Sequence, residues 1–246
     1  MKPGSERLAH AERWLVDSLR VIRPSFVSYQ VSADMTQALG QIEQLRRSGA
    51  AVTTTHQLVR ATAVAFARNP GLHQMISGTR RHRPERIDIG LSITGETFVA
   101  PVLVLEGADK KSVVELAEET ARRVPEVRKA DKEKLAGLRK WGWLAPTPAL
   151  RRAIMRRLFS RTDVIRQAAG TFQVSTVPVD AAVTSVFLAS GVLVGGQVGA
   201  RVVALNGQPA VRPMMTLTLS GDHNVWDGRA AARFLAEVRA ELEQPS

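Results

Sequence analysis

The sequence has no cysteine among its 246 residues. Disulfide bonds, cysteine metal sites and a cysteine nucleophile are therefore excluded. Four histidines have no potential metal ligands at the spacing that metal sites use. They are His10, His56, His73 and His82. The glycines within 195–199 match no phosphate-binding loop. We therefore expect neither a metal nor a P-loop nucleotide site.

Long apolar runs are also missing. No stretch approaches the roughly 20 apolar residues that a membrane-spanning helix needs, and residues 1–7 lack the apolar core of a secretion signal. We expect a cytoplasmic protein. Internal repeats and low-complexity linkers are absent too, so the chain, with 44% hydrophobic residues, fits one folded domain over residues 1–246.

Acidic residues are outnumbered by basic ones, which gives the chain a net charge of +11. Such a charge favours anionic partners such as nucleic acid, acidic carriers, phosphorylated cofactors or anionic lipid, and it does not choose among them. Much of the excess lies in residues 131–167, which hold ten basic and three acidic residues, a net charge of +7. The basic residues there are Lys132, Lys134, Arg139, Lys140, Arg151, Arg152, Arg156, Arg157, Arg161 and Arg166.

This basic segment also has helical periodicity. Apolar side chains recur at helical spacing at Leu150, Ile154, Leu158 and Phe159. Arginines fill the remaining surface, and Trp141 and Trp143 precede the helix. A basic amphipathic helix can lie on an anionic membrane, dock an acidic partner, or pack on its own protein with its arginine face in water. These three alternatives stay open.

Hydrophobic periodicity predicts helices interleaved with strands. Helices are expected over 5–22, 35–47, 56–68, 109–123 and 227–243. Strands are expected over 26–31, 87–93, 98–105, 171–177, 184–188, 191–198, 201–204 and 211–220. The basic cluster at 80–83 is expected to be a solvated turn. The order of these elements, which ends in a long strand, a turn and a helix, predicts an α+β sandwich.

The turn after the last long strand carries the candidate chemistry. It reads Ser-Gly-Asp-His-Asn-Val-Trp-Asp-Gly over residues 220–228. A histidine such as His223, fixed at the end of an apolar strand, can take a proton from a thiol and return it, because its ordinary pKa lies near neutrality. Asp227 follows four positions later and can fix the local geometry. A structural histidine could stand in the same string, so the motif gains its meaning from context.

The wider sequence supplies that context. Residues 206–228, with the helix sequence at 229–235, form one extended signature, and residues 170–175 read Gly-Thr-Phe-Gln-Val-Ser. Shorter matches follow in order at 31–36, 69–73, 86–90, 99–102 and 108–112. Together these segments resemble the catalytic domain of the dihydrolipoyl acyltransferases of 2-oxo acid dehydrogenase complexes. The resemblance covers 5–128 and 168–245 and leaves out the basic insert.

The resemblance implies a chloramphenicol acetyltransferase-like fold, a two-layer sandwich of a mixed sheet and packed helices, assembled as a homotrimer. It implies active sites between subunits, in a channel that admits coenzyme A from one side and dihydrolipoyl from the other. His223 would deprotonate the attacking thiol. Ser175 of the neighbouring subunit would hydrogen-bond the oxyanion, a contribution of roughly a hundredfold or more in rate. Asp227 would orient the site, and it would also suit a helix N-terminus.

Four departures from the family pattern bear on function. Neither a lipoyl or peripheral-subunit-binding domain nor its flexible linker precedes the catalytic part, so we expect a carrier supplied in trans. Asn224 stands where the family usually has arginine. The glycine-rich stretch and the Asn-Pro-Pro loop expected after Ser175 are replaced by the sequence at 177–191. The basic insert at 131–167 is the fourth.

Three functions are compatible with these observations. The first is an acyltransferase that exchanges acyl groups between coenzyme A and a dihydrolipoyl or phosphopantetheine thiol, and it needs both thiols from partners because the chain has no cysteine. The second is a trimeric scaffold subunit of a multienzyme complex, with little or no catalysis. The third, suggested by charge alone, is a membrane- or nucleic-acid-associated binding protein. We favour the first, without a metal or nucleic acid, in a trimer that could build a larger assembly.

Overall fold

A mixed sheet forms the centre of the molecule. The computed structural model describes residues 9–21, 25–77, 80–95, 97, 99–185 and 188–245. The strand order is β1-β9-β7-β6-β4-β5, with β8 paired to β9. The strands of this sheet are β1 (Phe26–Asp34), β4 (Ile89–Ser92), β5 (Val102–Leu105), β6 (Phe172–Thr176), β7 (Gly191–Gly195), β8 (Gly199–Leu205) and β9 (Gln208–Asp222). Only β6 pairs parallel to its neighbours β4 and β7, and the other pairings in this sheet are antiparallel.

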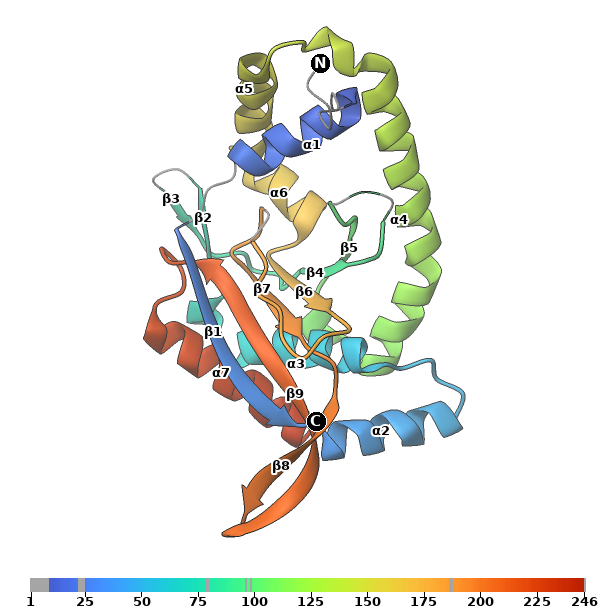
Figure 1. Ribbon diagram of the computed structural model, residues 1–246, viewed down its shortest axis with the longest axis vertical. Coiled ribbons are helices and arrows are strands. Elements are labelled where there is room, and N and C mark those ends of the chain that lie inside the picture. Colours follow the sequence, from blue (N-terminus) through green and yellow to red (C-terminus); the bar gives the residue numbers. More distant parts are fainter. Residues whose placement is uncertain are drawn as a thin grey trace, which may run out of the picture.

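Two groups of helices surround the sheet (Figure 1). The first group covers one face and comprises α2 (Thr36–Arg47), α3 (Thr54–Arg68), α7 (Gly228–Glu243) and the beginning of α4 (Val113–Trp141). The second group lies at one end of the long axis and comprises α1 (His10–Val21), α5 (Pro148–Phe159), α6 (Thr162–Ala169) and the end of α4. None of the helices in the described ranges has both the length and the apolar character needed to cross a bilayer.

Short elements complete the described chain. They are the 3-10 turns η1 (Pro70–Leu72), η2 (Ala108–Lys110) and η3 (Gly142–Leu144), and the strands β2 (Met75–Ser77) and β3 (Arg80–His82), which pair antiparallel. The predicted solvated turn at 80–83 is therefore partly a strand. Residues 184–185 and 188 are not in a strand, which corrects the expectation for 184–188.

The main core lies between the sheet and the first group of helices. Alternate residues of β9 point into it, because successive side chains of a strand face opposite sides. An aromatic cluster sits at its centre, with ring centroids 4.8 to 6.2 Å apart. Its members are Phe66, Phe172, Trp226 and Phe234, all at most 1% exposed. The predicted α+β sandwich with a mixed sheet is thereby confirmed.

Candidate functional site

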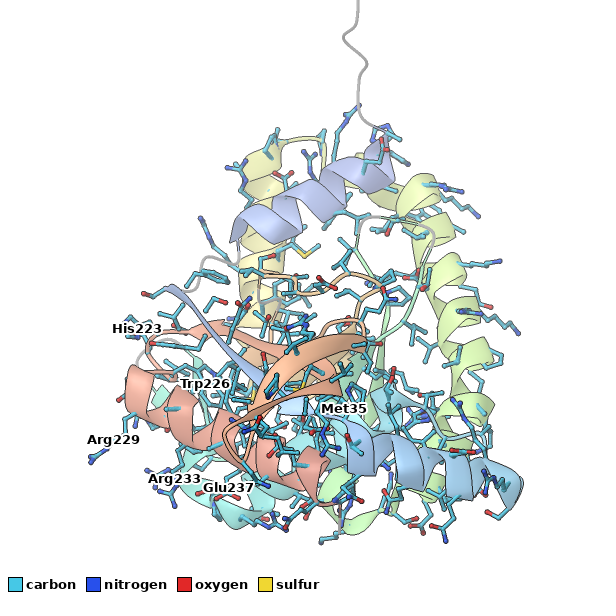
Figure 2. All side chains as sticks on the ribbon, turned by 60° about the horizontal axis from the view of Figure 1, so that its bottom comes forward. Met35, His223, Trp226, Arg229, Arg233 and Glu237 are labelled. Atoms are coloured by element: carbon cyan, nitrogen blue, oxygen red, sulfur yellow. The ribbon has the colours of Figure 1, made fainter. Side chains whose placement is uncertain are left out.

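His223 lies where the longest strand leaves the sheet. β9 runs through the core to Asp222, and the chain then turns into α7 at Gly228. The backbone N–H of His223 donates to the Ser25 carbonyl at 2.5 Å, which fixes the turn to the start of β1. The side chain of His223 is exposed at the edge of the molecule, beside the N-terminal end of α7 (Figure 2).

The imidazole of His223 is held by a backbone carbonyl. Its Nδ1 lies 3.1 Å from the carbonyl oxygen of Trp226. A carbonyl only accepts hydrogen bonds, so this bond forms when Nδ1 carries the ring proton. The neutral ring then has an unprotonated Nε2, which can accept a proton from a bound group. This arrangement is compatible with a general base.

Trp226 fixes the carbonyl that holds this ring. Its side chain is fully buried and points inward between α7 and the sheet (Figure 2). The indole Nε1 donates to the Ser190 carbonyl at 3.0 Å. Gly221 lies against the indole, and a Cβ at that position would come within 2.2 Å of Trp226 Cδ1. The Gly221 position therefore admits only glycine while Trp226 keeps its place.

Asp222 and Asn224 close the turn itself. Both the backbone N–H of Asn224 and its Nδ2 donate to Asp222 Oδ1, at 3.1 and 2.8 Å. The backbone N–H groups of Val225 and Trp226 donate to the Asp222 carbonyl. Asn224, which departs from the family pattern, is thus a structural part of the turn that presents His223.

Asp227 caps helix α7. Its Oδ1 accepts a hydrogen bond from the Ala230 N–H at 2.7 Å, and its backbone is extended as N-cap residues require. The hydrogen bonds found in the described ranges do not include one between Asp227 and His223. The structure therefore gives Asp227 the local role of fixing where α7 begins.

Ser175 lies far from His223 within one chain. In the sheet register Ser175 is level with Val194, and Val194 is level with Thr218. His223 follows Thr218 by five residues, about 16 Å along the strand, and two strand spacings add about 10 Å across the sheet. A single chain therefore does not bring these two groups together.

Ser175 lies on the face of the sheet opposite the main core, in a row with Val194 and Thr218. Its neighbours Phe172 and Val174 point into that core, so Ser175 faces the other way. Thr218, on the same row, accepts a hydrogen bond from the Gln30 amide at 3.1 Å. Ser220 is fully buried on this face, and its hydroxyl has no partner in the described residues. The sheet thus offers hydrogen-bonding groups along the side on which Ser175 lies.

A cationic groove lies beside β3. It has a volume of about 690 Å³ and is lined by Arg81, Arg83, Arg86 and Arg166. Its acidic lining residues are Glu85 and Asp163, and Asp163 is paired with Arg161 at 2.6 Å. The lining therefore carries an excess of positive charge suited to an anion.

This groove continues toward the histidine. Met75 and Thr162 line both the groove and a smaller pocket of about 30 Å³. The smaller pocket is also lined by Asp222 and Val225, which flank the His223 turn in the chain. The cationic groove and the His223 turn are thus neighbours.

Sequence reasoning missed most of this groove. The basic run at 80–83 was visible in the sequence, whereas the fold adds Arg86, from the segment between β3 and β4, and Arg166 of α6 to the same groove. Arg86 and Arg166 both pair with Asp88, which is 1% exposed. Among the described residues, no three acidic or histidine side chains gather as a metal ion would require.

Comparisons with known proteins agree with this architecture. The family model described as 2-oxoacid dehydrogenases acyltransferase (catalytic domain) matches residues 10–136 and 188–246, so Ser175 and most of the basic insert fall between the matched parts. A dihydrolipoyllysine-residue succinyltransferase component of the 2-oxoglutarate dehydrogenase complex from Rickettsia bellii is 33% identical over 192 residues. This match covers 76% of the chain and only 40% of the relative's length.

Solved structures share the fold across nearly the whole chain. A dihydrolipoamide acetyltransferase of Azotobacter vinelandii, solved to investigate a serine, a histidine and an asparagine in its catalytic mechanism, has a TM-score of 0.74 at 20% identity, covering 99% of this chain and 92% of that one. A chloramphenicol acetyltransferase has a TM-score of 0.52 at 13% identity, with 96% of each chain covered. The expected chloramphenicol acetyltransferase-like fold is confirmed. Because the family model matches most of its length, the chain belongs to the 2-oxoacid dehydrogenase acyltransferase catalytic-domain family.

Proposed function

We propose that the chain is a thiol acyltransferase that moves an acyl group between coenzyme A and a carrier thiol. The observation that supports it best is the hydrogen bond between His223 Nδ1 and the Trp226 carbonyl, because it leaves Nε2 free to take a proton. No cysteine side chain of this chain can supply either thiol. The acceptor would be a dihydrolipoyl or phosphopantetheine group on a separate carrier protein.

The reaction would run in two proton transfers. His223 Nε2 takes the proton of the attacking thiol, and the thiolate adds to the thioester carbonyl. The resulting oxyanion accepts a hydrogen bond from Ser175 Oγ of the neighbouring subunit. The tetrahedral intermediate then expels the other sulfur, which takes the proton back from His223. The acyl group has moved from one thiol to the other, and the enzyme is unchanged.

A homotrimer would bring Ser175 to His223. The register separates the two residues within one chain, so a shared site needs a second copy. The β8–β9 hairpin extends away from the body (Figure 1), with Val202 73% exposed and Val211 68% exposed. Exposed valines on a protruding hairpin suit contact with a neighbouring subunit. Such trimers could build a larger assembly with the carrier and other enzymes.

The Azotobacter relative supports the choice of residues. The histidine and asparagine investigated there are four positions apart, as are His223 and Asp227 here. In this chain the residue at that spacing is an aspartate, which caps α7. We propose that Asp227 positions the histidine turn by fixing the start of that helix.

The cationic groove would hold the phosphates of coenzyme A. Its arginines provide charge-assisted hydrogen bonds to phosphate oxygens, and its volume suits a nucleotide. The adjoining pocket of about 30 Å³ is lined by residues that flank His223 and is too small to hold a pantetheine arm. We propose that the arm runs over the surface from the groove toward Nε2.

The test is acyl exchange between acyl-coenzyme A and dihydrolipoamide with the intact protein. The His223→Gln variant should be slower by about a hundredfold to ten-thousandfold, because the general base is lost. His10→Gln, which changes an exposed histidine of α1, should keep the wild-type rate. Equal rates for wild type and His223→Gln, with no binding of coenzyme A, would instead favour the scaffold function.

A further inference from the structure

The end of α4 and all of α5 form an unusually basic stretch. From Lys134 to Thr162 the sequence has eight basic residues and no acidic one. The family model matches residues 10–136 and 188–246, so most of this stretch lies outside the matched parts.

Exposed apolar side chains gather in the same stretch. Trp141, Trp143 and Leu144, where α4 passes through η3 toward α5, are each more than half exposed. On α5 the exposed apolar residues are Leu150, Ile154 and Leu158, at 36% to 45% exposure. We call these six residues the corner patch.

A buried ion pair sets the orientation of α5. Arg151 is 4% exposed and donates through Nε to Asp17 of α1 at 2.7 Å. Arg151 Nη1 also donates to the carbonyls of Ala145 and Pro146, both at 2.9 Å. Ile154 and Leu158, three and seven positions after Arg151, lie close to its face of the helix, yet with Leu150 they stay 36% to 45% exposed.

Cations surround the corner patch. Arg139 and Lys140 precede the two tryptophans, and Lys140 Nζ lies 5.1 Å from the Trp141 ring centroid. Arg156 and Arg157 are both exposed on α5, and Arg157 lies next to the apolar stripe. The pattern is therefore indole and aliphatic groups flanked by positive charge, with no carboxylate from the same stretch.

The corner patch occupies a protruding end of the molecule. Figure 1 shows the turn between α4 and α5 at one end of the long axis and the β8–β9 hairpin at the other. A protruding corner can enter a flat, fluid surface without a matching shape. Tryptophan and arginine at a helix corner are typical of segments that lie in the headgroup region of a bilayer.

We propose that the corner patch is a peripheral binding surface for anionic lipid membranes. The tryptophans and the leucines would enter the headgroup boundary while the flanking arginines and lysine meet lipid phosphates. Charge complementarity favours an anionic surface, and the large share of exposed apolar side chains favours lipid over a purely ionic partner. This proposal does not depend on acyl transfer, because the corner patch lies outside the His223 turn.

The test is cosedimentation of the intact protein with vesicles. We expect binding to an equimolar mixture of phosphatidylcholine and phosphatidylglycerol, weakening as salt is raised, and little binding to phosphatidylcholine alone. Trp141→Ser with Trp143→Ser, and separately Arg156→Gln with Arg157→Gln, should each lower the partition constant by about tenfold or more. Arg229→Gln with Arg233→Gln on α7 removes the same charge elsewhere and should change it little (Figure 2).

Three results would overturn the proposal. One is no vesicle binding, and retention of the protein by polyglutamate through the corner patch would then assign the surface to an acidic protein. Another is an equal loss of vesicle binding in the α7 control. The third is a change in oligomeric mass in the tryptophan double variant, which would mean that a second copy of the chain covers the corner patch.

Discussion

Backbone groups hold the candidate base in place. The Ser25 carbonyl fixes the His223 N–H, and the Trp226 carbonyl fixes the ring. Neither contact needs a charged neighbour, so the orientation of His223 does not depend on the arginine that Asn224 replaces. At the scale of single residues, the site is therefore built by the turn and by the buried indole behind it.

The groove arginines can be tested by kinetics. We expect Arg81→Ala with Arg83→Ala to raise KM for acyl-coenzyme A by about tenfold or more, because each charge-assisted hydrogen bond contributes on the order of 1.5–3 kcal/mol. Acyl-pantetheine lacks the nucleotide phosphates, so its KM should not change. A similar loss with both substrates would contradict a phosphate contact. Arg229→Ala with Arg233→Ala is the charge-matched control.

Two buried histidines predict how stability depends on pH. Burial lowers the pKa of His56 below its ordinary 6.5. Burial also lowers the pKa of His73, although the Pro84 carbonyl and Asp88 act in the opposite direction. Below pH 6.5 these two histidines then bind more protons in the unfolded chain than in the folded one. The free energy of unfolding therefore decreases as the pH is lowered.

Urea denaturation at pH 7.5 and pH 5.5 measures this effect. Wild type should be less stable at the lower pH, and His73→Gln should reduce the difference between the two values. The Nε2 of His73 lies 2.7 Å from Thr171 Oγ1, so the variant should also lower stability at both pH values. His10→Gln should leave the pH difference as in wild type. An unchanged difference in the His73 variant would sink this explanation.

Among the secondary-structure elements, helix α1 is held in position by an ion pair buried between α1 and α5. Asp17 is 3% exposed and accepts from both Arg151 and Arg152 of α5, at 2.7 and 3.1 Å. These residues are more than a hundred positions apart in the chain. The ion pair therefore joins the N-terminal helix to the insert and fixes which face of α5 turns inward.

Removing the buried carboxylate should be costly. Asp17→Asn leaves the Arg151 guanidinium buried without its counter-ion, and we expect a loss of about 3–5 kcal/mol in the free energy of unfolding. The double variant Asp17→Leu with Arg151→Met should recover most of it, because an apolar pair fills the same space without a charge. Asp163→Asn, in an exposed ion pair, is the control and should have much less effect. Chemical denaturation followed by circular dichroism measures all three.

Local signals predicted some elements well and missed where others end. The expected helices at 35–47 and 227–243 match α2 and α7 within a residue, because their apolar periodicity is strong. The helix expected over 109–123 instead begins after Ser112, which caps it with Glu115, and continues through Pro125 to Trp141. Pro125 is exposed, so the carbonyl that it leaves without a partner can meet water.

At the scale of the whole molecule, Ser175 and His223 are too far apart to act in one site of a single chain. The sheet order separates Ser175 from His223 by two strands and most of a strand length. If both act in one site, that site lies between copies of the chain.

Mixing two inactive variants tests this directly. Ser175→Ala and His223→Ala should each be slow alone, by about a hundredfold or more. Coexpressed, they should form mixed trimers in which one site combines an intact Ser175 with an intact His223, so activity should return to a substantial fraction of wild type. Size-exclusion chromatography with light scattering checks that trimers form. If the mixture is no faster than the separate variants, Ser175 does not act across a subunit boundary.

The sequence by itself determined the fold class, the family resemblance and the turn around His223. Those features depend on residues close together in the chain, whose periodicity, caps and motif spacing are local. Only the tertiary structure decided that Arg151 turns inward, that Arg166 joins Arg81 in one groove, and that Ser175 and His223 lie far apart in one chain. The physical reason is that the partner of a buried charge and the register of a strand are both set by segments remote in sequence. A local sequence pattern does not show which segments those are.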